Sequence, residues 1–259
     1  MIRRRDSREL EKMHQANAIV LRTLEVLERA LEPGITTAEL DRIAAAEIAK
    51  EGAVPAFKGY RGFPASLCVS VNDEVVHGIP SSTRKLAQGD VVSLDLGAIV
   101  DGYYGDNAIT AGVGEISPEL ERLLAVAEEA MYKGIEASRP GNRISDIGYA
   151  VSTFVERHGF SVVRDFVGHG IGRALHEDPP VPNFVQAGRD PKLTPGICLA
   201  IEPMVNLGSH HVKTLSDRWT VVTMDGSVSA HFERSVAVTD YGPWILAEPR
   251  AVFEGAKFV

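Results

Sequence analysis

The chain has 259 residues, of which 44% are hydrophobic and 24% charged, a composition typical of one globular domain spanning residues 1–259. Its net charge of −8 argues against a nucleic-acid partner, because phosphate binding requires a basic face. No stretch approaches the roughly 18 consecutive apolar residues of a membrane helix, and no apolar segment follows the arginines near the start. Cys68 and Cys198 lie far apart and form no disulfide framework, so we expect a reducing, cytoplasmic compartment.

Two helices are predicted near the start of the chain. The first extends from about Ser7 to Leu31, with Asp6 or Ser7 as its N-cap, and the Pro33-Gly34 pair stops it because proline cannot continue a helix. The second begins after Thr36, which can form a capping box with Glu39 at the third position after it. Gly52 ends this second helix.

A hairpin after these helices carries the first two candidate metal ligands. Asp101-Gly102 lies between two alternating apolar runs within residues 91–110, and this dipeptide favours a two-residue turn. A turn centred there pairs Gly97 with Asp106, which places Asp106 diagonally across from Asp95 on one face. Two buried carboxylates in this position suit two metal ions about 3.5–4 Å apart better than they suit a strand cap and a turn decoration.

The second half of the chain repeats the glycines and prolines of the first. Two more helices are predicted, one from Ser117-Pro118 to Pro140-Gly141 and one ending at Gly159. One constant shift in residue number takes Pro33, Gly34, Gly52 and Gly89 to Pro140, Gly141, Gly159 and Gly196, and Asp95 to Glu202. Because these residues fix where helices and turns end, we predict an internal repeat, roughly 20–106 and 127–233, in an α+β fold with pseudo-two-fold symmetry. A carboxylate from each half would then lie near the axis.

Three further residues complete an oxygen-rich candidate site. His169 lies between two glycines, which let the backbone approach another group closely, and Glu202 and Glu233 accompany apolar strands. Taken alone, His169 could be structural and Glu233 could pair with Arg234. Together with Asp95 and Asp106 they provide four carboxylates and one imidazole, which suit Mn²⁺, Fe²⁺ or Co²⁺ better than a structural zinc ion.

The chain resembles the type I methionine aminopeptidases along almost its entire length. The motifs that carry this resemblance are Tyr60-Arg61-Gly62-Phe63-Pro64, Ser70-Val71-Asn72, His77-Gly78-Ile79-Pro80, Leu94-Asp95, Gly105-Asp106, Gly168-His169-Gly170-Ile171-Gly172, Ile201-Glu202-Pro203 and Glu233. The resemblance implies the pita-bread (creatinase/aminopeptidase) fold, with two pseudo-symmetric halves around a central antiparallel sheet. It also implies removal of the initiator methionine from nascent proteins and peptides with a small second residue, by a hydroxide held between two metal ions.

The resemblance also implies how the site residues divide their roles. The metal ligands would be Asp95, Asp106, His169, Glu202 and Glu233. His77 and His176 would hydrogen-bond the scissile amide, and Glu202 would transfer the proton. A monovalent cation is implied near Asn72 and Ser229. The implied partners are the N-terminal peptide substrate and the ribosome, without a membrane, and we expect a monomer.

An apolar pocket for the methionine side chain is implied as well. Its lining would comprise Tyr60, Phe63, Cys68 and Trp219, with Phe57 and Leu175, beside His77 and His176. A thioether packs well against aromatic rings. Some family members have cysteine where Phe57 stands and phenylalanine where Leu175 stands, so the pocket keeps its apolar character with a different shape. Phe57 and Leu175 could equally be ordinary core residues.

Three other interpretations are possible on a related fold. A proline-specific aminopeptidase or prolidase generally carries a large N-terminal domain, whereas only the first predicted helix precedes Pro33 here. A type II methionine aminopeptidase would carry an insertion between His169 and Glu202, and the segment between them is too short for a helical subdomain. A metal-free binding protein would have lost ligands, and this chain retains all five.

Overall fold

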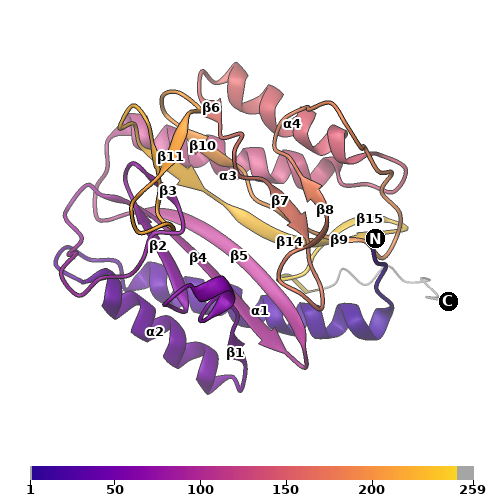
Figure 1. Cartoon of the computed structure of the whole chain (residues 1–259), viewed down its shortest axis with the longest axis horizontal. Coiled ribbons are helices and arrows are strands. Elements are labelled where there is room, and N and C mark those ends of the chain that lie inside the picture. The colour runs from indigo at the N-terminus through magenta and orange to yellow at the C-terminus, as the bar shows by residue number, and fades with distance from the viewer. Residues whose placement is uncertain (1, 250–259) are drawn as a thin grey trace.

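Four α-helices and a large antiparallel sheet make up the computed structural model, which describes residues 2–249 (Figure 1). The helices are α1 (Ser7–Arg29), α2 (Thr37–Lys50), α3 (Pro118–Ala137) and α4 (Ile144–Arg157), with a short 3₁₀ helix, η1 (Tyr60–Gly62). Over the same described range, none of the helices combines the length and the apolar character that crossing a bilayer requires.

Nine strands form the large sheet, in the order β1-β4-β5-β14-β9-β7-β8, with β2 also paired to β4 and β15 to β14. Two three-stranded sheets, β13-β10-β6 and β11-β12-β3, accompany it. The strands are β1 (Val54–Pro55), β2 (Leu67–Val71), β3 (Glu74–Val76), β4 (Val91–Val100), β5 (Tyr103–Gly112), β6 (Ser161–Val162), β7 (Gly168–Gly170), β8 (Glu177–Val181), β9 (Cys198–Ile201), β10 (Met204–Asn206), β11 (Val212–Thr214), β12 (Val221–Thr223), β13 (Ser229–His231), β14 (Glu233–Thr239) and β15 (Gly242–Ile245). The predicted α+β class with a central antiparallel sheet is confirmed.

The first three helices begin where their capping residues predict. Asp6 caps α1 by accepting hydrogen bonds from the backbone of Arg8 and Glu9, and the Glu9 side chain completes a capping box. Thr36 and Glu39 form the predicted box at the start of α2. At α3, the side chain of Ser117 accepts from the backbone of Leu120. Helix α1 ends at Arg29, slightly before the predicted stop at Pro33-Gly34.

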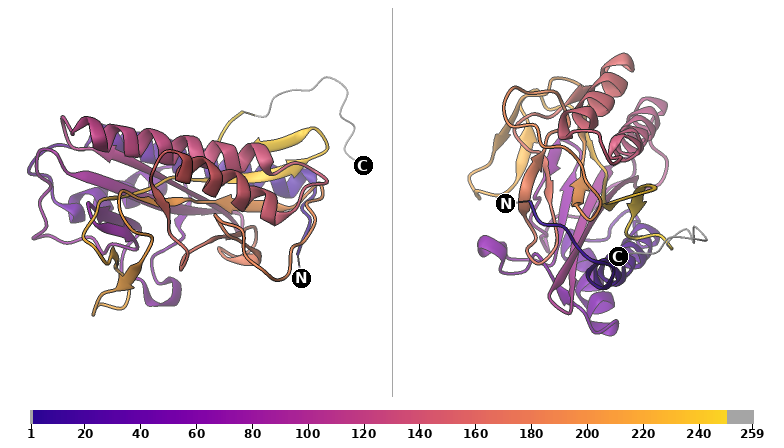
Figure 2. Two further views of the ribbon diagram at one scale, coloured as in Figure 1. Left: turned by 90° about the horizontal axis from the view of Figure 1, so that it is seen from above. Right: turned by 90° about the vertical axis from the view of Figure 1, so that its right-hand side faces the viewer.

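The helices pack against the sheet in two pairs, each over its own apolar core. Helices α1 and α2 cover a cluster that includes Leu94 and Leu96 of β4. Helices α3 and α4 cover a second cluster that includes Leu199 and Ile201 of β9. Figure 2 shows all four helices toward one side of the sheet, with β3, β11 and the η1 turn toward the other. Because strand side chains alternate between faces, Asp95, between Leu94 and Leu96, points away from the helices.

The two halves correspond in backbone geometry. Both ends of α4 are displaced from those of α2 by the same shift in residue number that relates Asp95 to Glu202. The isolated bridge between Thr36 and Lys85 has its counterpart between Arg143 and Lys192, at the same shift. These matches support an internal repeat over roughly 20–106 and 127–233 within one catalytic domain, which stays a prediction.

The hairpin of β4 and β5 has the predicted turn and register. Asp101 and Gly102 have φ values of 50° and 78°, the left-handed conformation that a two-residue turn of this kind requires. Gly97 pairs with Asp106, and Asp95 pairs with Ala108. Asp95 and Asp106 therefore lie diagonally across the hairpin on its helix-free face, as predicted.

Candidate active site

All the predicted site residues line one cavity of about 130 Å³. Its lining comprises the acids and histidines Asp95, Asp106, His169, Glu202, Glu233, His77 and His176, the predicted pocket residues Tyr60, Phe63, Cys68 and Trp219, and also Phe57, Arg61 and Leu175. The cavity thus joins a polar floor to an apolar wall. Loops and strands that are far apart in the sequence contribute to both parts.

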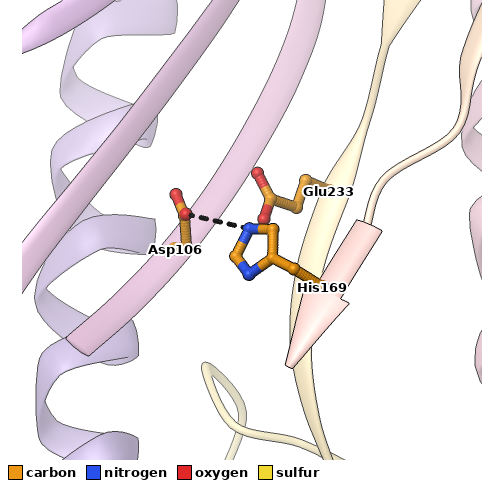
Figure 3. A group of neighbouring side chains, drawn as sticks. All are labelled: Asp106, His169 and Glu233. Atoms are coloured by element: carbon orange, nitrogen blue, oxygen red, sulfur yellow. Dashed lines mark ion pairs between the residues drawn. The ribbon is translucent and has the colours of Figure 1, made fainter. Parts of the chain in front are cut away.

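The polar floor gathers acids and a histidine from both halves of the chain. Asp106 of β5, His169 of β7 and Glu233 of β14 offer ligand atoms that all lie within 4.8 Å of one another (Figure 3). The Nε2 atom of His169 lies 3.9 Å from Oδ2 of Asp106 and 3.5 Å from Oε1 of Glu202. Asp95 joins this floor from the neighbouring strand β4.

Its neighbours fix the orientation of His169. Nδ1 lies 2.9 Å from the carbonyl oxygen of Gly170, so the ring proton on Nδ1 donates there and Nε2 presents its lone pair to the floor. Both flanking positions of β7 require glycine. A Cβ atom at Gly168 would lie 2.3 Å from the carbonyl oxygen of Ala200, and one at Gly170 would lie 2.2 Å from that of Asp178. The predicted close backbone approach around His169 is confirmed.

The backbones of Asp106 and Glu233 are fixed by polar side chains outside the cavity. The amide of Asp106 donates to Oδ1 of Asn17 and to Oγ of Ser235, and the Ser235 hydroxyl donates back to the carbonyl of Asp106. The guanidinium of Arg234 donates to the carbonyl oxygen of Glu233 at 2.7 Å. Arg234 therefore holds the strand through its main chain rather than pairing with the carboxylate of Glu233.

The floor fits divalent cations by its unsatisfied oxygens and by its charge. Oδ1 of Asp95, Oδ1 of Asp106 and Oε1 of Glu233 are buried, and none of them has a hydrogen-bond partner within residues 2–249. Burial raises the pKa of Asp95 to about 7 and that of Glu202 to about 8. Burial first, and repulsion by neighbouring acids second, raise the pKa of Asp106 and Glu233 well above the usual range. Bound cations would reverse this repulsion, and carboxylates with one imidazole suit Mn²⁺, Fe²⁺ or Co²⁺.

Two further histidines lie at the edge of the floor as neutral rings. Nδ1 of His176 lies 2.9 Å from the hydroxyl of Tyr60, and the centroid of its ring lies 4.1 Å from that of His169, with the two ring planes tilted by 35°. Burial lowers the pKa of His77 to about 4, and burial followed by the charge of Arg61 lowers that of His176. Both rings can donate one hydrogen bond at neutral pH without carrying a charge.

The apolar wall forms a compact cluster beside this floor. The ring centroids of Phe63 and Trp219 lie 5.1 Å apart in an edge-to-face arrangement, and those of His77 and Trp219 lie 6.1 Å apart with the rings nearly perpendicular. Phe57 and Leu175 are buried in the same cluster and also line the cavity, so they are pocket residues as well as core residues. Burial raises the pKa of the Cys68 thiol well above its ordinary value, which keeps the thiol neutral. The wall can therefore accept an uncharged side chain.

Two residues near the cavity have no role in the sequence predictions, although Arg61 stands within one of the motifs. Arg61 lines the cavity with a left-handed backbone (φ 49°) and its guanidinium lies over the ring of Tyr60. His231 is buried, and its Nε2 lies 3.7 Å from Oε2 of Glu202. Strand alternation in Ser229–Glu233 is the signal that could have found His231, because it shares a face with Glu233 while Phe232 turns to the helix side.

The predicted cation loop brings its two segments together. The amide of Ser229 donates to the carbonyl oxygen of Asn72 at 2.9 Å, and Asn72 has a left-handed backbone (φ 59°). The side-chain oxygen of Asn72 accepts from the amide of Val91. The segments predicted to hold a monovalent cation thus lie side by side, and cation binding stays a prediction.

Comparisons with known proteins agree with this geometry. The model of metallopeptidase family M24 matches residues 11–240. The methionine aminopeptidase of Clostridium acetobutylicum is 54% identical over 246 residues, which covers 95% of this chain and 98% of that protein. The crystal structure of a methionine aminopeptidase from Thermotoga maritima has a TM-score of 0.94 and 42% identity, and the match covers 96% of this chain and 100% of that one.

A proline-specific relative is more distant. The X-Pro aminopeptidase of Thermotoga maritima has a TM-score of 0.75 and 23% identity, and the match covers 96% of this chain but only 63% of that one. At this identity the likeness shows the fold alone. The pita-bread fold is thus common to both groups, whereas the sequence agrees far better with the methionine-specific group.

Proposed function

Because this chain belongs to metallopeptidase family M24, and within it to the methionine aminopeptidases, we propose that it removes the initiator methionine from nascent proteins whose second residue is small. Removal of an N-terminal methionine and the need for divalent metal ions follow from that membership. The single observation that carries the finer proposal is the cavity in which Asp106, His169 and Glu233 lie beside the aromatic wall of Phe63 and Trp219.

Two divalent ions, Co²⁺, Mn²⁺ or Fe²⁺, would be held by Asp95, Asp106, His169, Glu202 and Glu233. Such ions, when bound, polarise the scissile carbonyl and lower the pKa of a nucleophilic water. The ligand atoms of Asp106, Glu233 and His169 lie within 4.8 Å of one another, and the resemblance implies that Asp106 and Glu233 would contact both ions. Unpartnered buried oxygens on Asp95, Asp106 and Glu233 support the assignment.

Three side chains would handle protons and orient the peptide. Glu202 would take the proton from the attacking water through a carboxylate oxygen and pass it to the leaving amine. In this role the Tyr60 hydroxyl, 2.9 Å from Nδ1 of His176, would donate to that nitrogen, so that the ring proton on Nε2 would be donated to the scissile amide. His77, whose ring lies nearly perpendicular to the rings of Phe166 and Trp219, would donate a second hydrogen bond there.

The aromatic wall would select the first side chain of the substrate. Tyr60, Phe63, Cys68 and Trp219 surround an apolar volume next to the floor, with Phe57 and Leu175 closing it. A methionine thioether gains contacts with aromatic rings that a shorter side chain loses. A small second residue would be required because a bulky one would crowd the floor.

The test is a panel of peptides that varies the first two residues, assayed with Mn²⁺, Fe²⁺ and Co²⁺ in turn. We expect Met-Ala and Met-Pro peptides to be cleaved and norleucine to be the best substitute for methionine. Alanine in first place should reduce kcat/KM tens-fold or more, since one methylene in an apolar pocket is worth about 1–3 kcal/mol. Efficient cleavage of Ala-Pro or Leu-Pro peptides would contradict the proposal and support the proline-specific alternative.

The remaining proposals concern the protein's location in the cell, its partners, its oligomeric state and a monovalent cation. A cytoplasmic location is supported by two buried cysteines that remain free thiols. Work on nascent chains at the ribosome follows from the proposed substrate. A monomer is supported because the described residues expose few large apolar side chains, namely Val54, Tyr149, Val185, Leu215, Met224 and Tyr241. A monovalent cation near Asn72 and Ser229 would brace the loop that ends β2.

A further inference from the structure

His231 is a buried histidine beside the candidate metal floor for which the proposed mechanism has no role. It ends β13, and only 1% of the residue is exposed. Both ring nitrogens are buried, and neither has a hydrogen-bond partner among the described residues. An unpartnered buried polar group is costly, so a ring in this position calls for a partner that the protein's working state supplies.

Two hydrogen bonds to a threonine on a neighbouring strand fix the backbone of His231. The hydroxyl of Thr110 on β5 donates to the carbonyl oxygen of His231 at 2.7 Å and accepts from its amide at 2.9 Å. That hydroxyl has a single proton, so the neighbouring Ser93 hydroxyl, 2.8 Å away, donates to it. A chain of hydroxyl groups from β4 and β5 therefore fixes His231, while its ring nitrogens stay free.

Glu202 lies between two imidazoles that differ in their available nitrogens. Its Oε1 atom lies 3.5 Å from Nε2 of His169, and its Oε2 atom lies 3.7 Å from Nε2 of His231. His169 has its Nδ1 proton on the carbonyl oxygen of Gly170, so its Nε2 presents a lone pair. Neither ring nitrogen of His231 hydrogen-bonds to another described residue, so Nε2 can carry the ring proton and donate it.

We propose that His231 is a positioning residue for Glu202, donating from Nε2 to Oε2 and thereby directing Oε1 toward the metal-binding side next to His169. A movement of under about 1 Å shortens the 3.7 Å separation to a normal hydrogen bond. This inference rests on the proposed role of Glu202 as a metal ligand and proton carrier. Carboxylates that bind metal ions typically need such outer hydrogen bonds to fix their orientation.

The test compares substitutions that differ in reach and in hydrogen-bonding ability. His231→Gln keeps an N–H donor of similar reach, His231→Asn keeps the amide but shortens it, and His231→Leu removes the donor. His158→Gln is the matched control, because its ring bonds the carbonyl of Phe154 on α4 and does not line the cavity. The readouts are Mn²⁺ affinity of the metal-free protein by calorimetry, kcat and KM on a Met-Ala peptide, and the melting temperature.

We expect His231→Asn and His231→Leu to lower Mn²⁺ affinity and kcat by about 10–100-fold, the usual effect of removing an outer partner of a metal ligand. KM should change little, because His231 does not line the cavity. His231→Gln should retain most of both properties, and His158→Gln should match the wild type. If the Leu variant does not fold, the comparison of Asn with Gln decides, because both carry the same amide.

A double substitution locates the effect. If His231 acts through Glu202, adding His231→Leu to Glu202→Gln should lower Mn²⁺ affinity no further than Glu202→Gln alone. Normal affinity and kcat in both the Asn and the Leu variants would overturn the inference. So would a Gln variant that loses as much Mn²⁺ as His169→Ala, since His231 would then be a ligand itself. A Glu202→Gln variant with normal affinity and turnover would instead refute the proposed function, and this inference with it.

Discussion

Asp95 lies in the middle of β4, where Cys68 of β2 and Ala108 of β5 pair with it on the two sides. Glu202 occupies the corresponding position of the second half, but there Pro203 follows the end of β9 and the chain resumes as β10 only at Met204. The N-terminal half thus places its acid within a continuous ladder, and the C-terminal half places its acid at a break. Because proline donates no backbone hydrogen bond, the break follows from the sequence itself.

This difference suggests how a repeated backbone came to serve two roles. A carboxylate within a ladder has little freedom, which suits a fixed metal ligand. Glu202 has a longer side chain than Asp95 and lies at a strand end, where fewer backbone pairs constrain it. Such a carboxylate suits a ligand that must also carry a proton. Asn183 holds Glu202 only through its backbone carbonyl, at 3.1 Å, and leaves the side chain to His169 and His231.

The largest expected effect comes from removing an acid of the rigid hairpin. Asp106→Ala should reduce kcat/KM by at least about 1,000-fold and lower the metal content, because the change removes a group proposed to contact both ions. Asp101→Asn, in the turn of the same hairpin, is the control, since Asp101 is exposed and pairs with Lys12 at 3.2 Å. Near-normal turnover and metal content in Asp106→Ala would contradict the role assigned to the hairpin.

A second pair of substitutions tests the contrast between the ladder and the break. Asp95→Asn should weaken metal binding but recover much of its turnover as the Mn²⁺ concentration is raised, because the amide keeps one ligand oxygen. Glu202→Gln should stay impaired on the order of 100-fold or more at saturating Mn²⁺, since it loses a proton carrier as well. Measuring the activity of each variant as a function of Mn²⁺ concentration tests both expectations. Full recovery of the Glu202 variant would show that the two acids are equivalent.

The smallest expected effect is on the stability of the metal-free protein. The folded-state pKa values of Asp95, about 7, and Glu202, about 8, lie above their unfolded values, so protonation of these acids stabilises the fold at low pH and is lost as the pH rises. The lowered pKa values of His77, about 4, and His169, about 3, act oppositely, but only below about pH 6.5.

Above about pH 6.5 the histidines no longer affect how stability depends on pH, and only the raised pKa values of the acids do. Between pH 6.5 and pH 8 Asp95 and Glu202 should therefore lower the unfolding free energy of the metal-free protein by about 2 kcal/mol, and Asp106 and Glu233 should add to this loss, measured as a falling melting temperature in the presence of a chelator. Saturation with Mn²⁺ should remove this decline, because the cations replace the protons. A melting temperature that rises over the same range without metal would contradict the assignment of repulsion among the four acids.

The sequence predicts local features well and distant contacts poorly. Asp101-Gly102 determines the hairpin register, and capping residues locate the starts of helices, because both depend on neighbours close in the chain. The motifs and the repeat also predict the proposed ligand residues, which the structure brings to one cavity. By contrast, the ion pair between Arg5 and Glu177 joins the N-terminal arm to the loop carrying His176, across most of the length of the chain. No local pattern reports such a contact.

Strand alternation places His231 on the same face as Glu233, but the sequence does not show which residues lie beside it. Its chain neighbour Glu233 draws attention as a ligand, but the importance of His231 depends on Glu202 and Thr110, which only the packed sheets bring beside it. The left-handed backbone of Arg61 is likewise a property of the folded turn. Prediction from sequence succeeds where one element determines the geometry and fails where two elements must meet.

The most direct test of the account is where the metal ions lie. Crystals grown with Mn²⁺ and measured at the manganese absorption edge should show two anomalous peaks, about 3.5–4 Å apart, among Asp95, Asp106, His169, Glu202 and Glu233. Ligands from both halves should contact these ions. Peaks that involve acids of one half alone, or that lie outside this cavity, would contradict the account of one metal site shared between the two halves.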